Sequence, residues 1–598
     1  MIGWVKIVAK RHWAALALAL VVSGVYGSHH LFISRILLAQ GAAYRPLTFA
    51  AHADTSVYGI RANAVYGGQW LAGDISIPAY AGNPSALPLL NSFIMGGLGR
   101  LLRSLERAFI LSDFLFPPLI FVALYFLAFE LTRARALAIF FAAFFIFIPK
   151  AILSFPPVSW PLLQTLLQRV LPDPSGILYF VRFDYPKITF LFSAPALYGT
   201  LRAVRRQERW SVWLAGICLG LMFYTYLYDW VYFFIGISLM GVMLALSGRY
   251  RACMRLVQIA GIGLVLSGAY WYNFFLLRQL PQYQDIAARI GVETGGFLRW
   301  ASVEKSYARI AILVVALWYL APKRERASAL YLSGLLLAFV AAVNIQIVTG
   351  FNPHPDHWYK ISFLPLALAM LSAGYWALLR WVPPRALASG AVIAAVATGL
   401  VFGRSVASQY YYSKKDAPYY TVDRSYAAAY DWIAEQAPPR SLVASLDTLT
   451  NNELTLYAPQ RTFLLNGLHT TAPDEKIWRR LMETAAVFGV SAEEFPALLR
   501  KDDLIFYLFL NEYGDRSFDG AFRNDERSKR VIPDAVRERM TRVYLRMRAE
   551  AKPEEIVLGA DYVVVGPREE AVSSFRLLQN LEKAYDAEGV RVYRVIKK

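Results

Sequence analysis

The chain is poor in cysteine: its 598 residues include only two, Cys218 and Cys253. Cys218 lies in an apolar stretch and Cys253 in a basic one, and residues 408–598 contain none. Disulfides therefore cannot hold the C-terminal part together, so it must depend on its own core. Metal sites built on several thiolates are excluded as well.

The sequence also lacks the short motifs that mark many enzymes. Residues 408–598 contain no glycine-rich phosphate loop, no nucleophile elbow and no spaced set of metal ligands. The formal charge is +19, but no basic stripe interleaved with stacking aromatics is present. Much of the excess lies in short clusters between apolar stretches, where anionic lipid and the inside-positive bias explain it. We therefore exclude nucleic acid as a partner.

The chain is rich in long apolar runs. Hydrophobic residues make up 57% of it, whereas soluble domains contain about 45–50%. Several apolar runs reach, or nearly reach, the roughly 20 residues that cross a bilayer. They predict a polytopic α-helical membrane protein with about 11 transmembrane helices. The first run is too long for a cleavable signal peptide, so we expect an uncleaved helix whose N-terminus lies inside.

Clusters of Lys and Arg between alternate runs orient the chain. Cytoplasmic turns are predicted near 133–135, 205–209, 249–255, 323–326 and 380–385. This alternation places the first loop (39–108) and the C-terminal block on the outer side of the cytoplasmic (inner) membrane. We expect a transmembrane catalytic domain over residues 1–407 and an extracytoplasmic α/β domain over 408–598. The sequence does not define the role of the second domain.

The C-terminal block mixes strand and helix patterns. Apolar runs at 561–565 and 590–596 predict buried strands with a helix between them. Ser491 and Glu494 form the ends of a capping box that opens a helix. Pro533 suits the first turn of a charged helix that reaches about residue 550.

The first outer loop offers the carboxylates best suited to chemistry. Residues 56–66 could form a helix capped by Asp54 or Thr55, and the alternative role of Asp54 is that of a general base held above the outer leaflet. Asp74 is either a turn residue or a substrate ligand. Further along, the spacing of the leucines between 98 and 109 predicts a helix lying on the outer leaflet.

The second outer loop ends in a charged segment just before an apolar run. Arg182, Asp184 and Lys187 are candidate substrate-binding residues there. Arg182 could grip a phosphate group as a fork and Lys187 as a point charge. The alternative is that both cations snorkel to the interface.

Two further outer turns are rich in aromatics and histidine. Tyr226, Tyr228 and Trp230 form either an interfacial belt or a stacking platform for a sugar ring or lipid tail. His357 and Lys360 are candidates for binding an anion at the membrane surface. His354, Asp356 and His357 could instead hold a metal, although their spacing matches no helical ligand pair.

Taken together, these parts resemble the GT-C class of integral membrane glycosyltransferases, which includes protein mannosyltransferases, aminoarabinose transferases and arabinosyltransferases. The stretch 83–90 resembles the proline-rich entry to that class's surface helix, and His357–Lys360 with Pro365 resembles the opening of a late span. The resemblance covers the layout of about residues 1–420. One departure is that many members carry a paired Asp-Glu soon after the first span, whereas here Thr55 follows Asp54.

The resemblance implies inverting transfer of a sugar from a polyprenyl-phosphate donor to a glycan, lipid or protein acceptor of the cell envelope. Asp54 would deprotonate the acceptor, and the departing phosphate would be stabilised by the cationic residues Arg182, Lys187, His357 and Lys360. A divalent cation, Mg or Mn, could share that task. Alternatives are a transporter or flippase of a lipid-linked glycan, a scaffold protein of the envelope, and a ligase of preassembled glycans.

Overall fold

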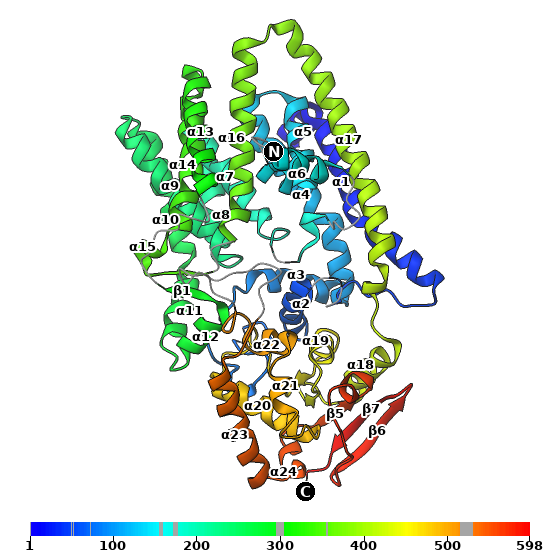
Figure 1. Cartoon of the computed structure of the whole chain (residues 1–598). Coiled ribbons are helices and arrows are strands. Elements are labelled where there is room, and N and C mark those ends of the chain that lie inside the picture. The colour runs from blue at the N-terminus through cyan, green and yellow to red at the C-terminus, as the bar shows by residue number, and fades with distance from the viewer. Residues whose placement is uncertain are drawn as a thin grey trace.

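The computed structural model describes residues 2–48, 51, 53–71, 73–154, 160–171, 178–183, 185–294, 304–353, 357–514 and 530–597. Figure 1 shows a long helical bundle in its upper half and a mixed α/β part, which carries the C-terminus, in its lower half. Helices α2 and α3 lie between the two, and α11 and α12 extend from the bundle alongside the lower part.

The bundle and its connections are built almost entirely from helices. In chain order these are α1 (Ile2–Ala39), α2 (Ala53–Tyr66), α3 (Leu90–Leu102), α4 (Leu105–Thr132), α5 (Arg135–Phe147), α6 (Trp160–Val170), α7 (Phe190–Arg206), α8 (Arg209–Met222), α9 (Leu227–Leu246), α10 (Tyr250–Leu266), α11 (Gly268–Arg278), α12 (Tyr283–Ile290), α13 (Glu304–Leu320), α14 (Arg326–Val343), α15 (Gln346–Thr349), α16 (His357–Trp381) and α17 (Pro384–Asp416). Two short antiparallel strands, β1 (Val292–Thr294) and β2 (Phe351–Pro353), join the loops before α13 and α16.

Among the described residues, six helices are long and apolar enough to cross a membrane, namely those at Lys10–Ala39, Leu105–Thr132, Leu227–Leu246, Lys323–Val343, His357–Trp381 and Ser389–Tyr420. The pair α10 and α11, bent by 55°, makes a seventh if it counts as one span. Shorter apolar helices at Arg135–Phe147, Arg209–Met222 and Tyr307–Leu320 accompany them. The chain is thus a mostly helical, multi-pass membrane protein, while eleven spans stay a prediction.

Small residues let helices of the bundle approach closely. Gly216 and Gly220, four positions apart on α8, face α10, where a Cβ on Gly216 would lie 2.7 Å from Ile262 Cβ. A Cβ on Gly220 would lie 2.5 Å from Leu266 Cβ. Since lipid supplies no hydrophobic force between helices, such close backbone contact is a main source of their association.

Three of the predicted cytoplasmic turns lie together at one end of the bundle. Glu130 forms ion pairs with Arg133 and with Arg206, whose Nε lies 3.0 Å from Glu130 Oε1. Arg205 joins the same network and donates to Glu325 at 2.8 Å. The turns near 133, 205 and 325 therefore share one side, as the charge pattern requires.

The predicted surface helix over 98–109 is wrong as drawn, because the chain forms two helices there. Helix α3 ends at Leu102, and Arg103 adopts a left-handed conformation with φ 55°. Ser104 then caps α4, its hydroxyl accepting from the backbone N–H of Arg107. Arg103 thus ends α3 and Ser104 starts α4, although the leucine spacing continues unbroken across both.

The C-terminal part contains a five-stranded sheet of order β4-β3-β5-β7-β6. Its strands are β3 (Leu442–Ala444), β4 (Arg461–Thr462), β5 (Tyr562–Val565), β6 (Leu581–Ala587) and β7 (Val590–Val595), with β3 parallel to β4 and β5 and the pairs β5–β7 and β7–β6 antiparallel. Its helices are α18 (Arg424–Gln436), α19 (Thr448–Tyr457), α20 (Asp474–Val487), α21 (Phe495–Leu498), α22 (Asp502–Phe509), α23 (Asp534–Glu550), α24 (Pro553–Val557) and α25 (Pro567–Glu570). One apolar core packs α18 on one face of the sheet, and a larger core packs α20, α22 and α23 on the other.

Most local predictions for this part are confirmed. Ser491 and Glu494 bond reciprocally as a capping box, at 2.8 and 3.2 Å, in the turn that leads into α21, whose N-cap is Glu494. Helix α23 follows Pro533 directly and ends at Glu550. A helix does lie between the two predicted strands, the short α25 over Pro567–Glu570, but residues 581–587 of the same stretch form the edge strand β6, which was not predicted.

Segments outside the bundle tie it to the C-terminal part. On α12, Arg289 is 1% exposed and forms an ion pair with Asp474 of α20. The backbone N–H of Asp474 donates to Asp285 Oδ2 at 3.1 Å, which holds the same two helices together. Glu512 lies beside Asp474, so the Arg289 guanidinium interacts electrostatically with both carboxyl groups.

Candidate functional site

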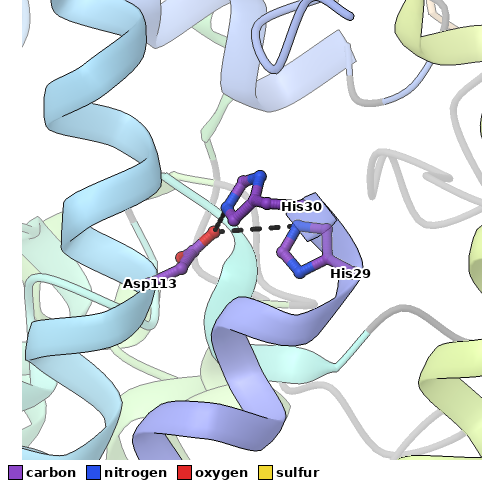
Figure 2. A group of neighbouring side chains, drawn as sticks. All are labelled: His29, His30 and Asp113. Atoms are coloured by element: carbon purple, nitrogen blue, oxygen red, sulfur yellow. Dashed lines mark hydrogen bonds and ion pairs between the residues drawn. The ribbon is translucent and has the colours of Figure 1, made fainter. Parts of the chain in front are cut away.

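A cluster of charged side chains lies buried inside the bundle, close to α2 and the C-terminal part. His29 and His30 from α1 lie beside Asp113 from α4 (Figure 2). Asp113 Oδ2 is 2.9 Å from His30 Nε2 and 3.9 Å from His29 Nε2. The other oxygen, Oδ1, accepts from Lys187 Nζ at 2.7 Å. All four side chains are almost fully buried, so Asp113 is compensated by Lys187 rather than by water.

Surrounding groups fix the orientation of this cluster. Lys187 Nζ also donates to Ser112 Oγ at 2.8 Å and lies 4.2 Å from the centre of the Phe109 ring. His29 Nδ1 is 2.8 Å from the carbonyl oxygen of Tyr26. Because a carbonyl can only accept, His29 Nδ1 carries the hydrogen. His30 Nδ1 is hydrogen bonded to the hydroxyl of Tyr44, in the predicted first outer loop.

The two histidines and Asp113 are close enough to bring three possible metal ligands together, since one ligand atom from each lies within 4.8 Å of the others. Mg and Mn, however, favour oxygen ligands, whereas two of these three atoms are imidazole nitrogens. Asp113 is already neutralised by Lys187, so a dication would leave a dry site with uncompensated positive charge. The described residues therefore fit a hydrogen-bonded ion pair better than a Mg or Mn site.

A second cluster, made of aromatic rings and His357, begins two residues before Lys187. Tyr185 stacks on Tyr226, with 4.8 Å between ring centres. The hydroxyl of Tyr226 is hydrogen bonded to His357 Nδ1 at 2.5 Å. Tyr228 packs against both His357 and Trp358, each at 4.8 Å. The end of the second outer loop, the turn before α9 and the start of α16 thus meet at one place, which we call the Tyr–His cluster.

Helix α2 reaches the Tyr–His cluster from the first outer loop. The hydroxyl of Tyr58 lies close enough to that of Tyr226 to interact with it electrostatically. Asp54 lies four positions before Tyr58, in the first turn of α2, and therefore on the same face of the helix. Its side chain lies outside the described residues. Because α2 begins at Ala53, Asp54 is inside the helix and is not its N-cap.

Asp229 is a buried carboxylate near the Tyr–His cluster. It lies in the first turn of α9, three residues after Tyr226, and is 4% exposed. It interacts with the hydroxyl of Thr189 and lines a small cavity together with Ser193 and Met222. It is not among the candidate residues of the sequence analysis.

The structure separates some of the predicted residues from this site. Asp74 is fully buried and its Oδ1 accepts from the backbone N–H groups of Ser76 and Ile77, each at 2.8 Å. Its Oδ2 accepts from Thr470 Oγ1 at 2.6 Å and from the N–H of Thr471 at 2.8 Å. With its oxygens hydrogen bonded inside the protein, Asp74 holds a turn and joins the first outer loop to the C-terminal part, which agrees with the turn residue that is one of its two predicted alternatives.

Lys187 and Trp230 also differ from prediction. Lys187 is predicted to bind a phosphate, but its ammonium is fully buried and lies 2.7 Å from Asp113 Oδ1. Trp230 stacks on Phe223 at 4.1 Å, in a separate aromatic group with Tyr270 and Trp271. Arg182 is half-buried at the end of a short helix over 179–181, and Lys360 is half-buried in the first turn of α16. Asp184, His354 and Asp356 lie outside the described residues.

Sequence reasoning missed His29, His30 and Asp113, although a signal was present. All three are polar residues within apolar runs, and such residues mark functional or paired positions in membrane helices. Asp113 looked like an interfacial residue because it lies near the end of its apolar run, and His29 and His30 were not singled out.

Comparisons with known protein families and with curated proteins find no match. Among solved structures, ArnT from Cupriavidus metallidurans bound to undecaprenyl phosphate is similar at 12% identity over 99% of this chain and 98% of that chain, with a TM-score of 0.46. The arabinofuranosyltransferase AftD from Mycobacteria matches at 14% identity over 99% of this chain and 42% of that one (TM-score 0.42). The Archaeoglobus fulgidus oligosaccharyltransferase matches at 10% identity over 92% and 78% (TM-score 0.40). These neighbours are GT-C glycosyltransferases, the class that the sequence resembles.

Proposed function

We propose that the chain is an inverting membrane glycosyltransferase, which moves a sugar from a polyprenyl-phosphate donor to an acceptor on the outer face of the cytoplasmic membrane. The observation that carries this proposal is the meeting of distant segments in the Tyr–His cluster. Tyr58, Tyr185, Tyr226 and His357 come from four separate parts of the chain. A donor with a long lipid tail requires a site at such a junction of apolar helices and outer loops.

The N-terminal ends of three helices meet at the Tyr–His cluster, and such ends suit a phosphate group. Tyr226 is the N-cap of α9, His357 is the first residue of α16, and Tyr185 lies just before α7. Helix N-termini present unpaired N–H groups and partial positive charge, which favour anions. Lys360 lies in the first turn of α16, and Arg182 precedes Tyr185 by three residues. We assign these two cations and His357 to the donor phosphate.

The reaction follows from these roles. Asp54 takes the proton from an acceptor hydroxyl, and the resulting oxygen attacks the anomeric carbon of the sugar. The bond between that carbon and the phosphate oxygen breaks, and its electron pair leaves with the polyprenyl phosphate. Arg182, His357 and Lys360 stabilise the developing negative charge. Tyr226 and Tyr228 provide aromatic faces beside the sugar or the first prenyl units.

The buried charged cluster has a positioning role in this scheme. Lys187 anchors its loop to Asp113 on α4, and through His30 to α1. Tyr185, two residues away, is thereby held against Tyr226. Loosening this anchor would displace the ring that faces the donor site.

The test is a transfer assay on the purified chain in lipid nanodiscs, with a panel of polyprenyl-phosphate sugars that starts from undecaprenyl phosphate carriers. Each reaction is followed by release of free polyprenyl phosphate and by label in an acceptor extract. Asp54→Asn is expected to lower the rate by about 10²–10⁴-fold at unchanged thermal stability. Asp586→Asn, an exposed change on β6, is the matched control.

Two outcomes would overturn the proposal. If wild-type protein carries a labelled lipid-linked sugar across proteoliposomes without cleaving it, the chain is a transporter. If Asp54→Asn transfers sugar as fast as the control variant, Asp54 is not the base.

A further inference from the structure

A cavity of about 70 Å³ lies between the C-terminal half of α2 and the C-terminal part. Ile60, Asn63 and Gly67 line it from α2, and Arg440, Gln460 and Arg461 line it from around β4. On this measure about 10–15 Å³ holds one water molecule, so the space admits a group the size of a phosphate or carboxylate. On α2 its lining residues follow Tyr58, the residue that reaches the Tyr–His cluster, by two residues at Ile60 and nine at Gly67, which is ~3–14 Å along the helix.

Arg461 is the feature that calls for a ligand. Its side chain is 5% exposed, and only Nη2 is used, donating to Gln69 Oε1 at 3.2 Å. Nε and Nη1 have no hydrogen-bond partner among the described residues. A buried guanidinium with two unmade hydrogen bonds is costly, and chains keep such groups when something else completes them.

Gln460 adds an acceptor beside these donors. It is 3% exposed, and its amide donates to the carbonyl of Ala437 at 2.9 Å. Its Oε1 has no partner in the described part of the chain. A ligand that brings both an anion for Arg461 and a hydroxyl for Gln460 would satisfy both side chains, whereas a bare oxyanion would satisfy only the first.

The surrounding charges favour an anion. Arg440 is exposed at the mouth of the cavity, and Arg61 lies behind it. Asp74 is a carboxylate that acts electrostatically on Arg461 and Arg61, and hydrogen-bond donors within the protein already hold both of its oxygens. Burial and the charge of Arg61 lower the pKa of His469, which also lines the cavity, to about 3. That imidazole is therefore neutral at physiological pH.

We propose that this cavity binds an oxyanion carried by a sugar, either a phosphate or a carboxylate, with Arg461 as its buried anchor and Arg440 at its entrance. The site does not depend on the proposed transfer reaction. It would give the chain a second, acidic-glycan binding site at the junction of the first outer loop and the C-terminal part.

The experiment is titration calorimetry on the full-length protein in nanodiscs, in buffer without phosphate or sulfate. The probes are glucose 6-phosphate, glucuronate, inorganic phosphate and neutral glucose, at constant ionic strength. We expect saturable binding of glucose 6-phosphate or glucuronate and none of glucose. Arg461→Gln should weaken binding at least tenfold, and Arg479→Gln, an exposed change on α20, should leave it unchanged.

Arg440→Gln covers the case in which Arg461→Gln does not fold, because Arg440 is exposed. We expect it to weaken binding about threefold, by loss of one charge at the entrance. No binding of any probe, or binding that neither arginine variant changes, would overturn the site. If inorganic phosphate binds as tightly as glucose 6-phosphate, the assignment to a glycan is overturned. Sugar transfer plays no part in these measurements, so the two proposals can fail separately.

Discussion

Lys187 in the bundle and Arg461 beside β4 are both cations buried by the fold, but their surroundings differ. Lys187 has a carboxylate at 2.7 Å, a hydroxyl at 2.8 Å and an aromatic face. Within the part of the chain that the structure describes, Arg461 has one amide oxygen as partner and two donors without any. A cation whose bonds are complete holds structure together, whereas one whose bonds are incomplete indicates a ligand. The same reasoning favours a structural role for Lys187 and supports the proposed ligand site at Arg461.

The largest effect on stability should come from breaking the ion pair between Lys187 and Asp113. Lys187→Met leaves Asp113 charged in an apolar interior, and we expect a loss of about 3–5 kcal/mol of stability. Thermal unfolding of the protein in detergent measures it. Adding Asp113→Leu should restore part of that loss, because the unpaired charge is gone. If the Lys187→Met variant alone were as stable as wild type, the structural role of Lys187 would be contradicted.

A smaller effect on stability is expected at Glu512, which shares the Arg289 cation with Asp474. Burial and neighbouring Asp474 raise the pKa of Glu512 to about 8. The folded protein then keeps a proton that the unfolded chain releases above roughly pH 4.3. Stability should therefore fall, by on the order of 1 kcal/mol, as the pH rises from that value through 8.

Glu512→Gln should remove this part of the pH dependence, because the amide cannot ionise. Unfolding temperatures at pH 5.5 and 8.5 provide the measurement, with Glu582→Gln on the exposed edge strand as control. An equal fall in wild type and Glu512→Gln would show that other groups cause it.

The smallest change is expected at Arg461. Without ligand, Arg461→Met removes two unmade donors and one bond to Gln69, so stability should stay within about 1 kcal/mol of wild type. Unfolding in ligand-free buffer tests this. A loss as large as that of Lys187→Met would mean that Arg461 is held by the protein alone, and the contrast between the two cations would disappear.

Local chemistry predicted much of the fold. The capping box of Ser491 and Glu494, the start of α23 after Pro533 and the buried strands β5 and β7 follow from neighbouring residues alone. Strand β6 did not, because it lies at the sheet edge, and charged residues there protect the edge while mimicking an exposed helix.

The candidate site was only partly predictable, for a similar reason. The sequence singled out Tyr226, Tyr228 and His357, which the structure brings together, because aromatics and cations at span ends have a recognisable pattern. The partner of Lys187 lies 74 residues away and that of Asp74 nearly 400 residues away, as the bonds to Asp113 and Thr470 show. No spacing rule connects such positions, so both residues looked available for substrate.

The most direct test of the donor site is photo-crosslinking with a polyprenyl phosphate that carries a diazirine next to the phosphate, followed by peptide mapping. We predict crosslinks in the segments around 178–187 and 357–366, reduced by excess undecaprenyl phosphate and by Lys360→Ala. Crosslinks confined to lipid-facing helices such as α13 or α17, and unaffected by competitor, would contradict the account.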